Sequence, residues 1–169
     1  MTGGSDRAWT VAPIAVRAPE STALLRDYLV DVANSYRLNR LGRVSTVAEL
    51  EQDWAGFGVG DLVPPNGVFL VGRYGGEPAA CAGLRRADGD TVELTRVFVR
   101  PARRGTGGAK RLLAAVEEAA MGLGATRIRL DTRLDLIEAR ALYVSHGYVE
   151  IPPYEDREYA EIWYAKDLT

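Results

Sequence analysis

The sequence predicts a single α/β (α+β) domain, built on a mixed, mostly antiparallel sheet of about seven strands with helices on both faces. Two observations lead to this expectation. Two hairpin signals, Gly75-Gly76 and Asp88-Gly89, join three strand-like segments into an antiparallel meander. After the meander, apolar stripes at helical spacing alternate with further strand segments. Strands first paired as hairpins and then crossed by helices give a mixed sheet.

The segments before the meander are expected to form one strand and two helices. Residues 9–16 alternate enough for a strand, and a helix opens at Pro19, because proline suits a first helical turn. Residues 46–49 have the spacing of a capping box and start the second helix. Residues 37–43 are interpreted as a basic connection. Residues 55–67 are too rich in Gly and Pro for regular structure, and so long a loop is usually functional or mobile.

The meander and the segments after it supply the other expected strands and helices. In chain order these are strands 68–73, 78–84 and 91–100, a helix from Gly107, strand 126–132, a helix at about 135–145, and strands 147–151 and 159–166.

The fourth strand of the chain contains a local irregularity. Its apolar residues are Val92 and Leu94, then Val97 and Val99, so the alternation changes phase midway. In a regular strand such a change would turn one half inside out. One inserted residue repairs it, and we therefore predict a β-bulge at residues 95–96 that separates neighbouring strands and frees backbone amides for a ligand.

The stretch after this strand is basic and rich in glycine. Residues 96–111 contain six cations and no acid, on a chain of formal charge −2. The pattern predicts a turn at Pro101, a glycine corner and the start of a helix. Lys110 and Arg111 oppose the helix dipole there, which is tolerable if the free amides bind an anion. An arginine-rich surface loop is the alternative interpretation.

Length and composition limit the number of domains and the class of protein. The 169 residues, 47% apolar and 26% charged, fit one globular domain over residues 1–169, with residues 1–8 expected to be flexible. No apolar run is long enough to span a bilayer, and the polar N-terminus is no signal peptide. Cys81 and His146 are each alone of their type, which argues against a disulfide framework and a metal site. A cytoplasmic protein that binds neither membrane nor nucleic acid is expected.

Two motifs then resemble one known family. Arg104-Gly-Thr-Gly-Gly-Ala109 matches the R/Q-x-x-G-x-G/A pattern of the GNAT superfamily of N-acetyltransferases. The segment from Ala139 to Tyr148 is similar to that family's A-x-x-L-Y-x-x-x-G-F/Y pattern. Both motifs lie on the expected elements at the family's separation, and the resemblance covers residues 68–168. It implies the GNAT fold, with the bulged fourth strand described above.

The resemblance also implies acetyl-CoA as the acetyl donor. Its pyrophosphate would lie on the amides of residues 104–110 at a helix N-terminus, which suits an anion physically. Its pantetheine arm would pair with the backbone of the bulged strand. The implied cofactor-binding residues are Val97, Phe98, Val99, Arg104, Gly105, Thr106, Gly107, Gly108, Ala109 and Lys110.

Two residues are candidates for catalysis. Tyr143 stands where the family carries its general acid, which would protonate the departing thiolate; a core aromatic is the alternative. Glu93, just before the bulge, is the candidate base, acting directly or through a water; a solvent-facing strand Glu is the alternative. The family commonly has Asn seven residues before the tyrosine, where this chain has Leu136. His146 is expected to cap the C-terminus of its helix rather than to catalyse.

The acceptor is expected to be an amine of a small molecule or a peptide, bound near residues 37–43, 56–66 and 154–157. The arginines there would suit a carboxylate and the acids a cationic amine, so the sequence does not select among amino acids, polyamines, aminoglycosides and peptides. It also leaves the oligomeric state open, a homodimer being one outcome. A non-catalytic acyl-CoA sensor and a phosphate-binding module are the alternative functions.

Overall fold

The computed structural model describes residues 8–169, so the expected flexibility of residues 1–8 falls almost wholly outside the described residues. Seven strands, four α-helices and one short 3₁₀ helix are described in this part of the chain. The elements are β1 (Trp9–Pro13), α2 (Pro19–Leu41), α3 (Val47–Ala55), β2 (Gly67–Tyr74), β3 (Glu77–Arg86), β4 (Thr91–Val99), η1 (Pro101–Arg103), α4 (Gly108–Gly122), β5 (Arg127–Thr132), α5 (Ile137–Ser145), β6 (Val149–Ile151) and β7 (Ile162–Asp167).

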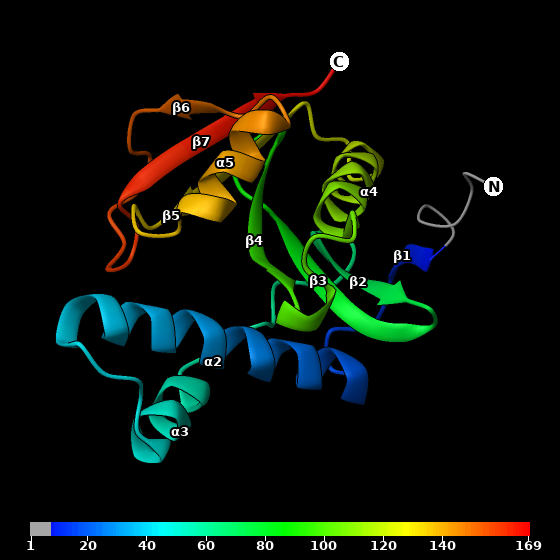
Figure 1. Cartoon of the computed structure of the whole chain (residues 1–169). Helices are drawn as coiled ribbons and strands as arrows, with labels where there is room; N and C mark the ends of the chain where they lie inside the picture. The colour runs from blue at the N-terminus through cyan, green and yellow to red at the C-terminus, as the bar shows by residue number, and fades with distance from the viewer. Residues whose placement is uncertain (1–7) are drawn as a thin grey trace.

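The strands form one sheet in the order β1-β2-β3-β4-β5-β7-β6 (Figure 1). Only β4 and β5 pair in parallel, and every other neighbouring pair is antiparallel. The crossover between β4 and β5 runs through α4. The predicted fold class, a mixed and mostly antiparallel sheet with helices on both faces, is therefore confirmed.

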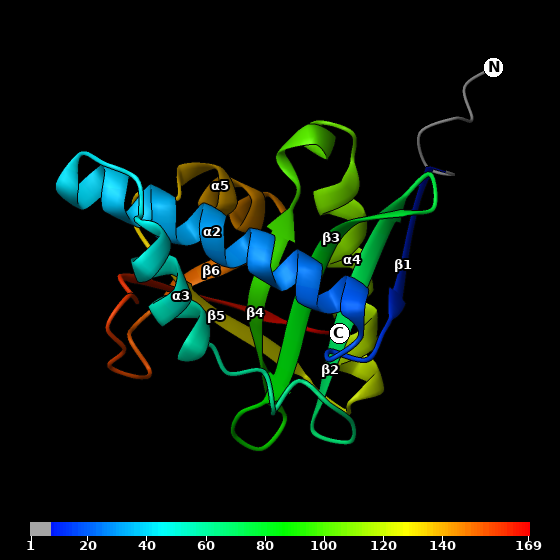
Figure 2. The ribbon, with the colours of Figure 1, turned by 90° about the horizontal axis from the view of Figure 1, so that it is seen from below.

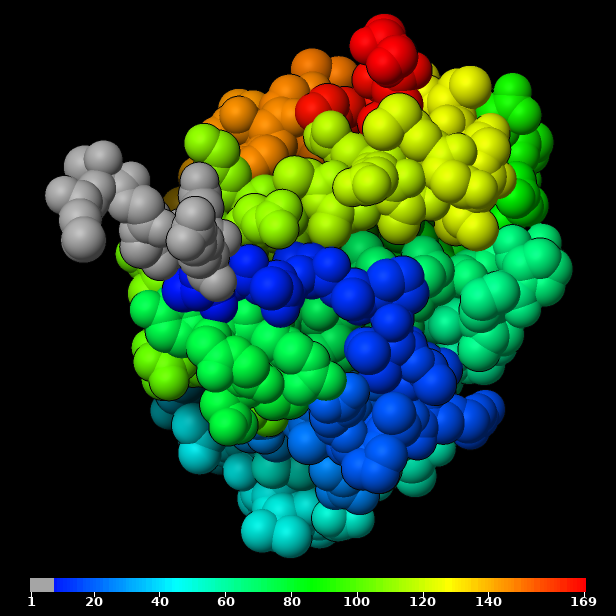
Figure 3. Space-filling model, turned by 90° about the vertical axis from the view of Figure 1, so that its right-hand side faces the viewer, coloured from blue at the N-terminus to red at the C-terminus, as the bar shows by residue number. Residues whose placement is uncertain are grey.

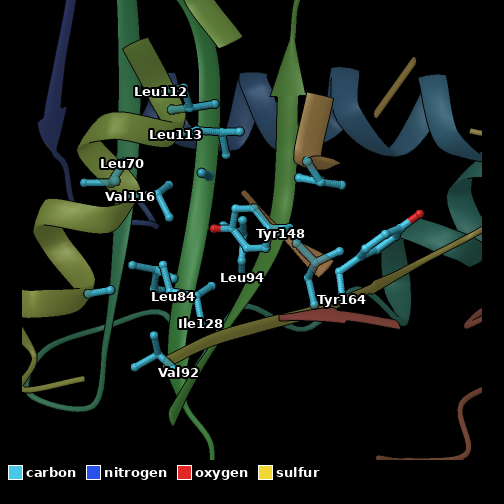
Figure 4. Close-up of a cluster of buried hydrophobic side chains, with 14 of the residues drawn as sticks. Leu70, Leu84, Val92, Leu94, Leu112, Leu113, Val116, Ile128, Tyr148 and Tyr164 are labelled. Atoms are coloured by element: carbon cyan, nitrogen blue, oxygen red, sulfur yellow. The ribbon is translucent and has the colours of Figure 1, made fainter. Parts of the chain in front are cut away.

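The helices cover opposite faces of the sheet. α2 crosses β3 and β4 on one face (Figure 2), and buries Leu24 and Leu25 against Phe69 and Phe98. α4 and α5 cover the other face, where the larger apolar cluster lies (Figure 4). At the outer edge, β1 runs between α4 and the β2–β3 turn (Figure 3). Val92 and Leu94 of β4 belong to the α4 side, so Glu93 between them points toward α2.

Both N-terminal helices start at the predicted signals, α2 at Pro19 and α3 after Thr46, and one predicted connection was wrong. Thr46 and Glu49 form the capping box, in which each side chain accepts a hydrogen bond from the other residue's amide. Residues 37–41, however, continue α2 instead of forming a loop. No helix breaker occurs there before Gly42, whose left-handed backbone (φ 72°) ends the helix.

The β-bulge in β4 is confirmed one residue beyond the expected place. Thr95 pairs with Gly83 and Phe98 with Cys81, so Arg96 and Val97 together oppose the single residue between those partners. Arg96 has φ 59°, the only positive φ of a non-glycine residue among those described. The extra residue keeps Leu94 in the α4-side cluster and Phe98 in the α2-side cluster.

The C-terminal elements are shorter than predicted. β7 begins at Ile162, because residues 152–161 form an irregular segment that returns over the α2 face of the sheet. β6 covers only residues 149–151, and α5 starts at Ile137. His146 caps α5, as expected: its amide bonds to Leu142 O, and its Nδ1 lies 3.1 Å from the same carbonyl oxygen.

Candidate active site

The N-terminus of α4 presents a row of free backbone amides. Residues 105–110 donate no backbone hydrogen bond to any described residue, whereas Arg111 N bonds to Gly107 O. Gly107 is the N-cap with φ 87°, and Gly105 has φ 78°. No atom lies within 4 Å of a Cβ placed on either glycine, so the space above them is open. This geometry suits an anion bound by amides and the positive end of the helix dipole.

Gly108 and Thr106 instead fix this corner to the sheet. A Cβ on Gly108 would lie 2.3 Å from Trp9 Cζ2, so only glycine fits against this buried ring. Trp9 Nε1 donates to Thr106 Oγ1 at 3.0 Å, and Thr106 Oγ1 donates to Arg103 O. The glycine corner is thus fixed to Trp9 of β1 on one side, and the space next to Gly105 and Gly107 on the other side is open. The sequence alone did not indicate this packing role of Gly108, because Trp9 is remote in the chain.

The cations of this corner have different partners. Arg104 Nε donates to Val99 O at 3.0 Å, and its Nη2 lies 3.4 Å from Asp31 Oδ2 of α2. The Arg103 guanidinium stacks over the Tyr74 ring at 4.7 Å, and Lys110 is exposed. The excess of positive charge therefore faces solvent around the free amides.

A gap opens between β4 and β5 next to the bulge. The parallel ladder pairs residues 91–93 with residues 127–129 and then stops, although β5 continues to Thr132. Arg100 N bonds to Ala79 O, and backbone groups of a strand point alternately to its two edges. It follows that the backbone N–H and C=O of Phe98 form hydrogen bonds with β3, while those of Val97 and Val99 point toward the gap. These groups are available to an extended ligand.

Tyr143 of α5 lies at this gap. Its side chain is 6% exposed and lines a cavity on the α2 face of the sheet. Its ring packs against Tyr148 and Tyr164. Its hydroxyl forms no hydrogen bond with any residue of the described chain. Burial raises the pKa of Tyr143 above its ordinary value, so the hydroxyl keeps its proton and can donate it. Leu136, in the position before α5, lines the same cavity with an apolar side chain.

A cavity of about 550 Å³ lies on the α2 face of the sheet. It is enclosed by α2, the loop after α3, β4, β5 and the segment before β7, so it reaches from Tyr143 to Glu93. Phe57, Arg37 and Arg157, from the three predicted acceptor segments, all line it. Those segments are therefore brought together, and the β4–β5 gap opens into the same space.

Glu93 sits in this cavity within a cluster of arginines. It is 3% exposed; Arg157 donates to both carboxylate oxygens, and Arg85 Nη2 donates to Oε1 at 3.1 Å. Burial alone would raise the pKa of Glu93, but the hydrogen bonds and charges of Arg157 and Arg85 outweigh it. The pKa of Glu93 therefore lies below its ordinary value, and the carboxylate is ionised at neutral pH.

Asp131 of β5 shares Arg157 with Glu93 and was not foreseen from the sequence. Its Oδ2 accepts from Arg157 Nη1 at 3.1 Å and from the Tyr154 hydroxyl at 3.4 Å, whereas its Oδ1 has no partner among the described residues. Burial raises the pKa of Asp131, against the lowering effect of the Arg157 charge. The signal that would have found it is its strand position: Arg129 and Asp131 alternate with Ile128 and Leu130 of the core.

Comparison with known proteins identifies the family. The model of the Acetyltransferase (GNAT) family matches residues 29–148. The chain belongs to this family. An IAA acetyltransferase of Azospirillum brasilense is 31% identical over 94 residues, 55% of this chain and 61% of the relative. The uncharacterized N-acetyltransferase YjgM of Escherichia coli is 36% identical over 90 residues, 52% of this chain and 54% of the relative. Each match thus covers less than two thirds of the relative.

Solved structures extend the likeness to the whole GNAT fold. An aminoglycoside 6'-N-acetyltransferase in complex with coenzyme A superposes with a TM-score of 0.63 and 17% identity. The match covers 94% of this chain and 96% of that one. At this identity the likeness concerns the fold alone. Among residues 8–169, no helix is long and apolar enough to cross a membrane, and no three His, Cys, Asp or Glu side chains gather as a metal site would require.

Proposed function

We propose that this protein transfers the acetyl group of acetyl-CoA to a primary amine of a small molecule or a peptide. The observation that carries the proposal is the order of four features along and beside β4. The free amides of residues 105–110, the open edge of the bulged strand, the Tyr143 hydroxyl and the acid-containing cavity follow one another. Such an arrangement suits a long anionic thioester at one end and an amine at the other.

The donor is proposed to be acetyl-CoA, because free amides suit its pyrophosphate and an open strand edge suits its pantetheine arm. We propose that the amides at Gly105, Gly107 and Lys110 hold its pyrophosphate, with Arg104, Thr106, Gly108 and Ala109 shaping that corner. The backbone groups of Val97 and Val99 hold the pantetheine arm, and Phe98 packs beneath it. One strand amide at the gap stabilises the oxyanion that forms when the amine attacks the thioester carbon.

Tyr143 and Glu93 are proposed to move the protons. Attack forms a C–N bond and breaks the C–S bond; the amine loses a proton and the thiolate gains one. Tyr143 donates to the sulfur through its free hydroxyl. Glu93 takes up the amine proton, directly or through a water. Asp131 pairs with the same Arg157, and its Oδ1, which has no partner among the described residues, offers a second carboxylate oxygen to the amine.

The burial of the only cysteine in the sequence agrees with direct attack in a ternary complex. Cys81 is fully buried in the α2-side cluster, and its thiol donates to Arg96 O at 3.4 Å. Burial raises the pKa of the Cys81 thiol to about 12, so it is neither accessible nor ionised. No cysteine thiolate is available to carry the acetyl group.

The test is to incubate the protein with acetyl-CoA and each amine of a broad panel, and to measure the release of free thiol. Turnover with at least one amine is expected, and mass spectrometry of the product should show the acetylated amine. A protein that binds acetyl-CoA tightly but turns over with none of the amines would instead be an acyl-CoA sensor. Absence of acetyl-CoA binding would remove both functions.

A further inference from the structure

Arg96 differs from the other arginines that line the cavity. Arg37 pairs with Asp53, Arg85 with Asp61 and Glu93, Arg133 with Asp135, and Arg157 with Glu93 and Asp131. Arg96 forms no ion pair with an acid of the described chain. Among the cavity arginines of residues 8–169, it alone has no carboxylate oxygen within 4.0 Å.

The Arg96 side chain is nevertheless held in place. Its Nη2 donates to Gly58 O at 2.8 Å, its Nη1 donates to Thr95 Oγ1 at 3.0 Å, and its guanidinium lies over the Phe57 ring at 4.2 Å. Its Nε is buried without a hydrogen-bond partner. All these contacts are with uncharged groups, and burial lowers the pKa of the guanidinium below its ordinary value.

The backbone of Arg96 also supports a dedicated role. Arg96 lies in the bulge with φ 59°, a conformation that is strained for a residue other than glycine. A partly buried charge without a counterion adds a desolvation penalty. A glycine would avoid both costs at this position. An anion bound in the cavity would offset the second one, because a guanidinium forms paired hydrogen bonds with a carboxylate.

The cavity is therefore polarised along β4. Glu93 and Asp131 lie at one end with their arginine partners, and Asp131 Oδ1, which has no partner among the described residues, can accept a hydrogen bond from an amine there. Arg96 lies three residues further along β4, in the bulge. The β4–β5 gap, where the thioester is proposed to lie, opens between them.

We propose that the acceptor is an amino carboxylate, a molecule that carries a primary amine and a carboxylate. The carboxylate binds Arg96, and the amine faces Glu93, Asp131 and the thioester. This inference rests on the proposed acetyl transfer and names its substrate class. It disfavours polyamines and aminoglycosides, because either would place a second cation next to Arg96.

The experiment compares each amino carboxylate with the amide of the same carbon skeleton. Glycine, β-alanine, 4-aminobutyrate, 5-aminopentanoate and phenylalanine are paired with their amides, and kcat/KM is measured from thiol release. The acids are expected to exceed the amides by at least about tenfold at one or more chain lengths, as one charge-assisted contact provides. The chain length with the largest ratio reports the distance from Arg96 to the amine.

Variants assign the preference to Arg96. Arg96→Gln should lower the acid-to-amide ratio of kcat/KM at least about tenfold, while Arg96→Lys should retain part of the preference. The control is Arg127→Gln, which removes an exposed arginine that pairs with Asp167 outside the cavity, and it should preserve the preference. Thermal unfolding and coenzyme A affinity close to those of the wild type show that the Arg96 variants are folded.

The outcomes separate this inference from the function on which it rests. Turnover of amides or of simple alkylamines at rates equal to the acids would leave acetyl transfer standing and overturn the carboxylate site. A preference for acids that persists in Arg96→Gln would overturn the assignment to Arg96. Absence of turnover with every amine would overturn both proposals.

Discussion

The replacement of Gly107 by leucine tests the anion site at the start of α4. Gly107 has φ 87°, and the space around a Cβ placed on it is empty to 4 Å. The Cβ of a leucine would therefore meet no atom beyond its chain neighbours, and the side chain would extend into the space in which we place the pyrophosphate. Gly124, beyond the other end of α4, is a matched control: its φ is 79° and its surroundings are equally open.

The expected magnitudes follow from these two geometries. Either leucine must adopt a left-handed backbone, so each variant should lose about 1–2 kcal/mol of folding free energy. For a chain of this size that corresponds to roughly 2–8 °C in the unfolding midpoint. Only Gly107→Leu should also lose hydrogen bonds to the pyrophosphate. The loss of one or two charge-assisted bonds is about 2 kcal/mol or more, which is roughly a 30-fold increase in Kd.

Calorimetric titration with coenzyme A and thermal unfolding of both variants measure these quantities. We expect similar midpoints for the two variants and weakened coenzyme A binding for Gly107→Leu alone. Equal affinities in Gly107→Leu and Gly124→Leu would refute the reasoning, because the pyrophosphate would then lie elsewhere.

Three further predictions concern single side chains. Tyr143→Phe should lower kcat far more than coenzyme A affinity, since it removes only a hydroxyl; equal losses in both would make Tyr143 a packing residue. Gly108→Ala should destabilise the fold by about 1–3 kcal/mol through the contact with Trp9, and an unchanged midpoint in thermal unfolding would contradict that contact. Glu93→Gln should cost about 1–3 kcal/mol at pH 7, because Arg157 and Arg85 lose charge-assisted hydrogen bonds to a buried carboxylate, although Arg157 keeps Asp131 and Glu155. The pKa of Glu93 is lowered from 4.5, so this stabilisation should be present above pH 4.5 and disappear as the pH falls through the folded-state pKa; a pH-independent difference between wild type and variant in urea unfolding would count against it.

Local signals in the sequence were sufficient for most of the fold. The capping box at Thr46, the glycine turns of the meander and the phase change in β4 each depend on residues close in the chain, and each is confirmed. The extent of α2 was misjudged because arginines at its end suggested a loop. Arginine has a good helix propensity, and the break comes only at Gly42.

The site was predictable where a motif marks it and not where distant segments meet. The glycine corner and Tyr143 belong to contiguous patterns, so the sequence could place them on their elements. Asp131, Arg157 and the unbalanced charge of Arg96 become visible only when β4, β5 and the segment before β7 are folded together. The same holds for Gly108, whose need for glycine comes from Trp9 at the other end of the chain.

The most direct test of acetyl transfer in a ternary complex is thiol release from acetyl-CoA, recorded first without and then with an amine acceptor. Because Cys81 is buried and the attacking group is the amine itself, we predict no burst of thiol before the amine is added and steady release afterwards. A stoichiometric burst without amine would show an acetylated enzyme and contradict direct attack. Absence of thiol release after the addition of every amine in the panel would contradict acetyl transfer itself.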